Sequence, residues 1–226
     1  VIMRADEGAG GGYRAAAAAV CFSFGDRARR LDEPERGSVQ CHCGQCTLQG
    51  RRRSVRSRRP RPRGQGKGRR TVMALILGTG VGGGIAVDGS ILQGPTHTGG
   101  EFGHTSAPAH LVAKHDLPIW RCGCGRMGCI ETYIAGPGLA RLAKHILGTD
   151  LTTDEIAARR DFDTGPVWQV WCDFGADLLH SLTLTADPDL IVLGGGLTHI
   201  EGLVDDLSAT ARRAQIGDFA VPELVL

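Results

Sequence analysis

A run of arginines divides the chain into two parts of different character. Residues 51–70, RRRSVRSRRPRPRGQGKGRR, contain eleven basic residues, no acidic residue and one apolar side chain, Val55. Residues 1–70 hold 17 Lys and Arg against 6 Asp and Glu, whereas residues 71–226 hold 9 against 18. A segment with so few apolar side chains cannot offset the entropy lost on ordering, so we expect residues 1–70 to be disordered.

The arginine run admits three interpretations. It can be a nucleic-acid tail, because arginines neutralise phosphates, although no aromatic side chain interrupts it for base stacking. It can be a solvated tail without a partner. It can also be translation in a shifted frame, since G+C-rich DNA read out of frame yields Arg, Pro, Gly and Ala. Codons can be chosen for residues 50–63 whose shifted frame encodes a run close to Asp-Asp-Ala-Ala-Ala-Phe-Ala-Leu, and we favour this third interpretation.

Six of the eight cysteines lie in two clusters. Residues 41–46, CHCGQC, contain enough ligands for zinc, but their spacing is cramped and no second half follows, so we interpret them as a chance match. The second cluster, Cys122-x-Cys124-x₄-Cys129, begins eighteen residues after His104. One His and three Cys match a structural zinc site, and free buried thiols are the alternative. We predict that His104, Cys122, Cys124 and Cys129 bind zinc.

A glycine-rich segment follows an apolar run. The run Val72–Leu77 predicts a buried strand, Gly78–Gly84 a loop, and Ile85–Val87 a second strand that turns at Asp88-Gly89. No helix directly follows the glycines and no Gly-Lys-Ser/Thr is present, which excludes a dinucleotide fingerprint and a P-loop. Backbone amides and the Thr79 hydroxyl could still approach phosphate oxygens, and we favour this function over a bulged hairpin without a ligand.

Two carboxylates flank the predicted zinc ligands. Glu101 lies three residues before His104, and Glu131 lies two residues after Cys129. A bound metal would therefore hold the two carboxylates near each other. Carboxylates in that setting suit a ligand rich in hydroxyls, because each accepts hydrogen bonds, whereas for either one alone surface charge is the alternative.

The rest of the sequence, from Glu131 onward, predicts an α/β arrangement together with the strands above. One helical face runs through Val167, Val170, Trp171, Phe174, Leu178 and Leu182, and the two tryptophans of this segment are expected in the core. A glycine triplet after a buried strand is where nucleotides bind in α/β sheets. The expected elements are a helix over Glu131–Leu147 ending at Gly148, a capping box from Thr152 to Glu155, a strand over Leu190–Leu193 ending at Gly194–Gly196, and a helix over Ile200–Ala214.

Taken together, these motifs resemble the ROK family (repressors, open reading frames, kinases) of sugar kinases. The resemblance covers residues 71–226 and rests on the glycine segment, Gly100–His104, Cys122–Cys129 with Glu131, and Pro188–Gly196. The connection between His104 and Cys122 is similar to that of bacterial N-acetylglucosamine kinases.

The resemblance implies an actin/hexokinase-like (ribonuclease H-like) α/β fold and a cytoplasmic kinase. It implies transfer of the γ-phosphoryl group of MgATP to the 6-hydroxyl of N-acetyl-D-glucosamine, with Glu101, His104 and Glu131 binding the sugar and structural Zn²⁺ on the four ligands above. It also implies a homodimer, with neither a membrane nor nucleic acid as partner. The implied ATP-binding residues are Gly78, Thr79, Gly80, Gly82, Gly83 and Gly84 at the phosphates, and Gly194, Gly195 and Gly196 at the adenosine.

The family pattern is incomplete in this chain. An Asp-x-Gly-Gly-Thr phosphate loop, the catalytic Asp expected shortly before the glycine segment, and a closing helix after Leu226 are missing from the sequence. Residues 51–70 occupy the place of the catalytic Asp, which favours the shifted-frame interpretation. We therefore expect residues 71–226 to form an incomplete larger lobe with little or no kinase activity.

Two alternatives remain open at this stage. A ROK transcriptional regulator would use the sugar site as a sensor, but residues 1–70 lack the two periodic helices of a helix-turn-helix. A glucokinase or an N-acetylmannosamine kinase would use the same site. No apolar run is long enough for a membrane span, and we find no secretory signal.

Overall fold

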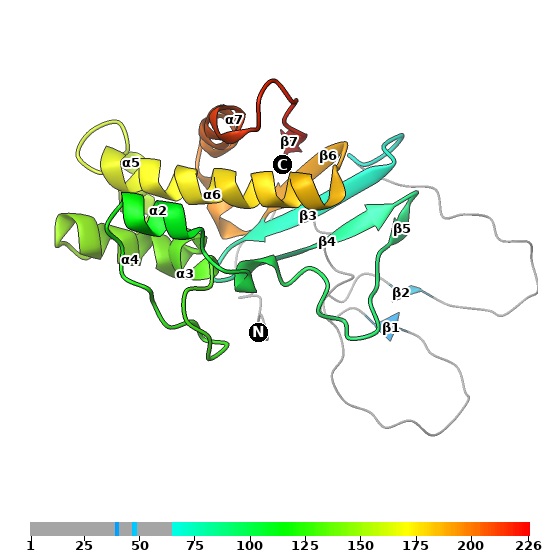
Figure 1. The fold of residues 1–226 in the computed structure, drawn as a ribbon, viewed down its shortest axis with the longest axis horizontal. Coiled ribbons are helices and arrows are strands. Elements are labelled where there is room, and N and C mark those ends of the chain that lie inside the picture. The colour runs from blue at the N-terminus through cyan, green and yellow to red at the C-terminus, as the bar shows by residue number, and fades with distance from the viewer. Residues whose placement is uncertain (1–38, 41–46, 49–64) are drawn as a thin grey trace, which may run out of the picture.

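The computed structural model of the chain describes residues 39–40, 47–48 and 65–226. Most of these residues form a mixed sheet packed with helices (Figure 1). Helix α6 runs along the molecule in front of the sheet in this view, and α2 to α5 gather toward one end. The expected α/β class is therefore confirmed for this part of the chain.

The sheet has five strands in the order β5-β4-β3-β6-β7. The central strand β3 (Thr71–Leu77) pairs antiparallel with β4 (Val81–Val87) and parallel with β6 (Leu190–Gly194). The edge strands are β5 (Ser90–Ile91) and β7 (Glu223–Val225). The predicted buried runs 72–77 and 190–193 thus lie side by side, because both are apolar enough to occupy the middle of a covered sheet.

The glycine-rich segment differs from its expected form. Only Gly78, Thr79 and Gly80 lie in the turn, whereas residues 82–84 belong to β4. This strand begins at Val81, four residues before its predicted start at Ile85. A Cβ atom on Gly83 would lie 1.9 Å from the carbonyl oxygen of Ala74, and the Gly83 amide donates to the Gly100 carbonyl at 2.7 Å. Glycine at position 83 therefore serves close packing of the backbone, a use that a loop interpretation does not predict.

Helices α2 to α6 lie between β5 and β6 in the chain, and α7 lies between β6 and β7. Two short 3₁₀ helices, η1 (Phe102–His104) and η2 (Gly196–His199), each follow a glycine-containing turn. The α-helices are α2 (Ala109–Lys114), α3 (Glu131–Ile134), α4 (Gly136–Leu147), α5 (Thr153–Ala158), α6 (Gly165–Ala186) and α7 (Leu203–Ala214).

Two local predictions are confirmed. At the start of α5 the Thr152 hydroxyl accepts from the Glu155 amide at 3.2 Å, and the Glu155 carboxylate accepts from the Thr152 amide at 2.8 Å. This reciprocal pairing is the predicted capping box. All six apolar residues of the predicted α6 face are buried, and Trp168 and Trp171 stack on each other in the core.

One predicted helix keeps its predicted ends, Glu131 and Leu147, but is divided in two, and another begins later than predicted. The helix expected over Glu131–Leu147 is interrupted at Ala135, whose backbone is extended, and resumes as α4 with Pro137 in its first turn. The break lets the Gly136 amide donate to the Gly78 carbonyl at 2.7 Å, a contact that a continuous helix would not allow. The helix expected from Ile200 begins at Leu203, because η2 and a left-handed Gly202 come first.

The core fixes the position of α3. Tyr133 is fully buried and stacks on Phe174 of α6 with ring centroids 4.7 Å apart. The Trp171 indole of α6 donates to the Ile134 carbonyl at 2.9 Å. A helix of four residues is not stable by itself, so these contacts with α6 hold it in place.

The last residues of the segment expected to be disordered, 65–70, are described by the structure and contact the sheet. The amides of Arg70 and Thr71 both donate to the Asp189 carboxylate at 2.8 Å, and Arg69 forms an ion pair with Glu223. Upstream, β1 (Val39–Gln40) and β2 (Thr47–Leu48) form an antiparallel pair. The rest of residues 1–64, including Cys41, His42, Cys43 and Cys46 and most of the arginine run, lies outside the described residues.

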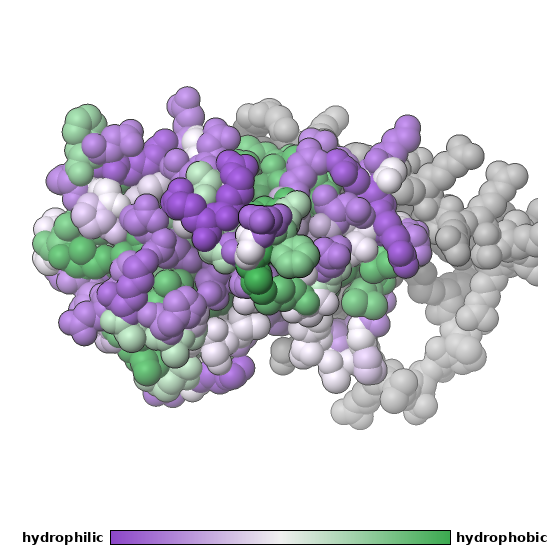
Figure 2. Space-filling view, turned by 45° about the horizontal axis from the view of Figure 1, so that its top comes forward, coloured by the Kyte–Doolittle hydropathy of each residue, from purple (hydrophilic) through white to green (hydrophobic). Residues whose placement is uncertain are grey.

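The face shown in Figure 2 is largely hydrophilic, with separate hydrophobic patches between the polar side chains. Most of the exposed large apolar residues of the described part lie outside helices and strands, and Leu184 of α6 is the exception: Leu92, Ile119, Met127, Phe162, Leu184, Ile216, Phe219 and Leu226. Among residues 65–226, no helix combines the length and the apolar character required to cross a bilayer.

Candidate metal centre

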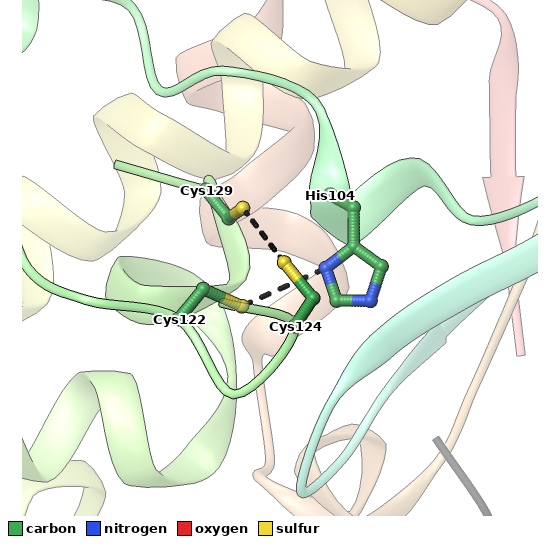
Figure 3. Close-up of side chains that lie close together, drawn as sticks. All are labelled: His104, Cys122, Cys124 and Cys129. Carbon is green, nitrogen blue, oxygen red and sulfur yellow. Dashed lines mark hydrogen bonds between the residues drawn. The ribbon is translucent and has the colours of Figure 1, made fainter. Parts of the chain in front are cut away.

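Four potential metal ligands converge at the end of η1. The Sγ atoms of Cys122, Cys124 and Cys129 and a ring nitrogen of His104 all lie within 4.8 Å of one another. Figure 3 shows the four side chains pointing toward one common region, three from a single loop and His104 from η1. Cys122 Sγ lies 3.6 Å from His104 Nδ1, and Cys124 Sγ lies 3.6 Å from Cys129 Sγ.

These separations fit a tetrahedral zinc ion. Zinc bonds of about 2.0–2.3 Å to nitrogen and sulfur place tetrahedral ligands roughly 3.3–3.8 Å apart. Both separations of 3.6 Å fall in this range, and one imidazole with three thiolates is a common structural zinc set. The structure therefore brings the four sequence-predicted ligands together in an arrangement that suits this metal.

The cysteine loop owes its shape to two glycines. Gly125 and Gly128 have φ angles of +92° and +68°, which an L side chain rarely adopts. The resulting hairpin is closed by a bridge between Arg121 and Met127. The Ile130 amide also donates to the Thr105 carbonyl at 2.9 Å, which ties the end of the loop to the residue after His104.

The three thiols differ in their surroundings. Burial raises the pKa of Cys122 to about 12, and burial also raises the pKa of Cys129. The pKa of the exposed Cys124 is lowered, because the backbone amide of Arg126 donates to its sulfur. A bound divalent cation would stabilise all three as thiolates, which is the form that binds metal.

Glu131 connects this centre to the glycine turn. Its Oε1 atom lies 3.6 Å from His104 Nδ1 and accepts from the Cys122 thiol at 3.0 Å. Its Oε2 atom accepts from the Val81 amide at 3.2 Å. The side chain is 14% exposed, so the carboxylate is nearly enclosed but still reachable.

Glu101 lies near the other ring nitrogen of the histidine. Its Oε2 atom is 3.7 Å from His104 Nε2, and its side chain is 31% exposed. The predicted proximity of Glu101, His104 and Glu131 is thus present in the fold. The imidazole lies between two carboxylates that come from segments thirty residues apart.

The two predicted glycine groups also lie side by side. Gly78 and Gly80 close the turn through a hydrogen bond of 3.0 Å from the Gly78 amide to the Gly80 carbonyl, and Thr79 is exposed at its tip. A Cβ atom on Gly78 would be 3.7 Å from the Gly196 amide nitrogen. The turn and the end of β6 therefore form one glycine-rich region at the carboxyl ends of β3 and β6, next to Glu131.

Three groups at this site were not predicted from the sequence. The Val81 amide binds Glu131, the Gly136 amide binds the Gly78 carbonyl, and the Arg126 guanidinium donates to the His104 carbonyl at 3.0 Å. The first two are backbone groups, which no motif marks. Arg126 stands inside the cysteine motif, but its spacing to the ligands does not indicate where its side chain lies.

Comparison with known proteins decides the family. A profile of the ROK family matches residues 62–225. The chain belongs to the ROK family. This ROK protein is 37% identical over 164 residues to the N-acetylgalactosamine kinase of Shewanella sp. (strain ANA-3), covering 69% of this chain and 51% of the relative. It is 40% identical over 142 residues to the N-acetyl-D-glucosamine kinase of Salmonella newport (strain SL254), covering 61% of this chain and 47% of that relative.

Solved structures confirm the expected fold. The ROK hexokinase from Thermus thermophilus is 29% identical with a TM-score of 0.60, and the match covers 70% of this chain and 52% of that one. The ROK glucokinase from Streptomyces griseus, solved with glucose and AMPPNP, is 26% identical with a TM-score of 0.60. This match covers 72% of this chain and 57% of the glucokinase chain. The ROK protein therefore has the actin/hexokinase-like α/β fold over its described part, and it spans about half the length of the curated relatives it matches.

Proposed function

We propose that residues 71–226 form the larger lobe of a sugar kinase that transfers the γ-phosphoryl group of MgATP to the 6-hydroxyl of N-acetyl-D-glucosamine. The observation that carries this proposal is the position of Glu131, whose two carboxylate oxygens face the His104 cluster and the glycine turn. A kinase must hold an acceptor hydroxyl close to the transferred phosphate. One side chain that contacts both regions is suited to that task.

Sugar recognition would use Glu101, His104 and Glu131. Carboxylates accept hydrogen bonds from hydroxyl groups, and each of the two has accessible surface. If His104 Nδ1 binds the metal, Nε2 carries the proton and is a donor on the side of Glu101. A sugar hydroxyl can both donate and accept a hydrogen bond, so this combination of two acceptors and one donor suits the hydroxyls of a hexose ring.

Phosphate binding would use the turn at residues 78–80. The Thr79 hydroxyl is exposed there, and no side chain of Gly78 or Gly80 blocks the approach of phosphate oxygens. Gly194, Gly195 and Gly196 at the end of β6 would lie on the adenosine side. Gly82, Gly83 and Gly84 lie in β4, so in this proposal they support the turn through strand packing and do not contact phosphate directly.

His104, Cys122, Cys124 and Cys129 would hold a structural zinc ion. With four protein ligands the ion has no open position, so it supplies rigidity to the loop that carries Glu131 and takes no part in the transfer. Arg126, through its bond to the His104 carbonyl, supports the same arrangement from outside.

The acceptor hydroxyl also needs a base, and the family places an Asp shortly before β3. Residues 51–70 of this polypeptide contain no acidic residue. We therefore expect this chain to bind sugar without turning it over.

The test is calorimetric titration of the zinc-loaded chain with N-acetylglucosamine, N-acetylgalactosamine and glucose, together with a coupled assay of ADP release. We expect saturable binding that is tightest for N-acetylglucosamine, with no ADP above the blank. Glu131→Gln should weaken binding about tenfold or more, because a hydrogen bond to a charged group contributes about 1.5–3 kcal/mol.

Glu201→Gln is the matched control, because Glu201 is exposed and outside the site. Equal affinities for the two variants, or no binding of any of the three sugars, would contradict the proposed site. Tighter binding of N-acetylgalactosamine would keep the site and change the substrate. ADP release above the blank would refute only the expected lack of turnover.

A further inference from the structure

One of the four clustered donors differs from the others in its accessibility. Cys124 is exposed, whereas Cys122 and Cys129 are 4% and 1% exposed. The loop therefore presents a single sulfur to solvent while keeping two others directly behind it. A small dissolved oxidant would reach Cys124 first, because susceptibility of a thiolate follows its exposure.

The Sγ atom of Cys129 lies 3.6 Å from that of Cys124. A disulfide needs the two sulfurs at about 2.05 Å, so the pair must close by roughly 1.5 Å. Glycines stand on both sides of Cys124, and no atom lies within 4 Å of the Cβ position of Gly123 or Gly125, so neighbouring atoms leave room for Cys124 to approach Cys129.

We propose that Cys124 and Cys129 form an oxidation site that takes hydrogen peroxide and closes to a disulfide. In the first step the Cys124 thiolate attacks one peroxide oxygen, the O–O bond breaks and hydroxide leaves, which produces a sulfenic acid. In the second step the Cys129 thiolate attacks the Cys124 sulfur, the S–O bond breaks and a second hydroxide leaves. The two thiolates lose two electrons in total, and the peroxide gains them and becomes, after protonation, water.

Closure of this disulfide removes two of the four metal ligands. A sulfur engaged in a disulfide is no longer a thiolate ligand, so only His104 and Cys122 remain, which are too few to retain a structural zinc ion. Cys129 is also two residues before Glu131, and the Thr132 hydroxyl donates to its carbonyl at 2.7 Å. The oxidised loop is therefore expected to release metal and to shift the start of α3.

This inference rests on the proposed zinc site for its metal-release step, but not on the proposed kinase function. The experiment treats the zinc-loaded full chain with increasing hydrogen peroxide, up to one equivalent per chain. To keep other thiols out of the readout, Cys21, Cys41, Cys43 and Cys46 are replaced with Ser. Released metal is followed with a coloured chelator, and cysteines are mapped by mass spectrometry.

Trypsin makes the linkage readable, because it cleaves after Arg126, between the two cysteines. The disulfide then joins residues 122–126 to residues 127–141, and fragmentation distinguishes Cys122 from Cys124. The expected result is a Cys124–Cys129 link that appears together with free zinc and is reversed by dithiothreitol plus zinc. Cys172, which is buried at 2% exposure, should stay reduced at the same peroxide level and is the internal control.

The variants separate the two steps. Cys129→Ser should leave a sulfenic acid on Cys124, trapped by a cyclic 1,3-diketone, with no linked peptide. Cys124→Ser should leave Cys129 reduced. A Cys122 link, irreversible oxidation of Cys124 without a link, or full retention of metal and thiols at one equivalent would overturn the proposal. If the reduced, zinc-loaded chain binds no sugar but still forms the Cys124–Cys129 link on oxidation, that result counts against the proposed kinase function alone.

Discussion

The amide nitrogen of Val81 donates a hydrogen bond of 3.2 Å to Oε2 of Glu131, and this bond joins the first residue of β4 to the first residue of α3. The two residues are fifty positions apart in the chain. Because Val81 directly follows the glycine turn, the bond couples the proposed sugar-binding carboxylate to the proposed phosphate-binding turn.

This coupling predicts different effects of two substitutions at one position. Glu131→Gln retains an oxygen that can accept from Val81, so the turn should keep its shape and only sugar affinity should fall. Glu131→Ala removes the acceptor and leaves the Val81 amide unpaired, so affinity for AMPPNP should fall as well, by about five- to tenfold. Titrations of both variants with AMPPNP measure the difference, and equal nucleotide affinities would contradict the coupling.

Removal of the proposed zinc ion should destabilise the fold. A ligand bound only by the native state contributes its binding free energy to stability, so stripping zinc with a chelator should lower Tm by about 5 °C or more. Added Zn²⁺ should restore Tm, whereas Mg²⁺ should not, because magnesium avoids thiolates. If the chelator left Tm unchanged, His104 and the three cysteines would not hold a metal, and the cysteines would be free thiols.

Gly83→Ala should be severely destabilising. Its Cβ atom would lie 1.9 Å from the Ala74 carbonyl oxygen in the central strand pair, and the backbone of β3 cannot move away without losing its own pairing. We expect a loss of about 3 kcal/mol or more in the free energy of unfolding, measured by urea denaturation. Gly99→Ala is the control, since no atom lies within 4 Å of its Cβ position, and a comparable loss there would show that the effect is not steric.

Asp173 on α6 should make stability depend on acid pH. Burial alone would raise the pKa of Asp173, but hydrogen bonds from Lys114, Gln169 and His115 at 2.8–3.0 Å outweigh burial and lower it. Since the folded-state pKa lies below the unfolded value of 3.8, the carboxylate stabilises the fold above that value. The contribution is lost as the pH falls through the folded-state pKa.

The matching variant is Asp173→Asn. It should lower the free energy of unfolding at pH 7 by about 1–2 kcal/mol, and the gap to the parent should narrow below about pH 4. Asp161→Asn, at an exposed position, should behave like the parent in the same urea titrations. If the gap were as large at pH 3 as at pH 7, protonation of Asp173 would not be the cause.

Several features could be predicted from the sequence because they depend on neighbours along the chain. The capping box at Thr152 needs only a Glu three residues later, and the buried face of α6 follows from its helical spacing. The cluster of four potential metal ligands was predictable for a related reason. Three cysteines on one glycine-containing loop are close whatever the rest of the fold does, so only His104 had to be brought to them.

The tertiary structure decided what depends on partners far away in the chain. Residues 82–84 are strand and not loop because Ala74 and Gly100 pack against Gly83, and the helix after Glu131 breaks at Ala135 because Gly136 binds Gly78. The bond between Val81 and Glu131 is of the same kind. Local propensity at glycines and at a four-residue helix is weak, so long-range hydrogen bonds and packing select the backbone there, and no pattern in the sequence records them.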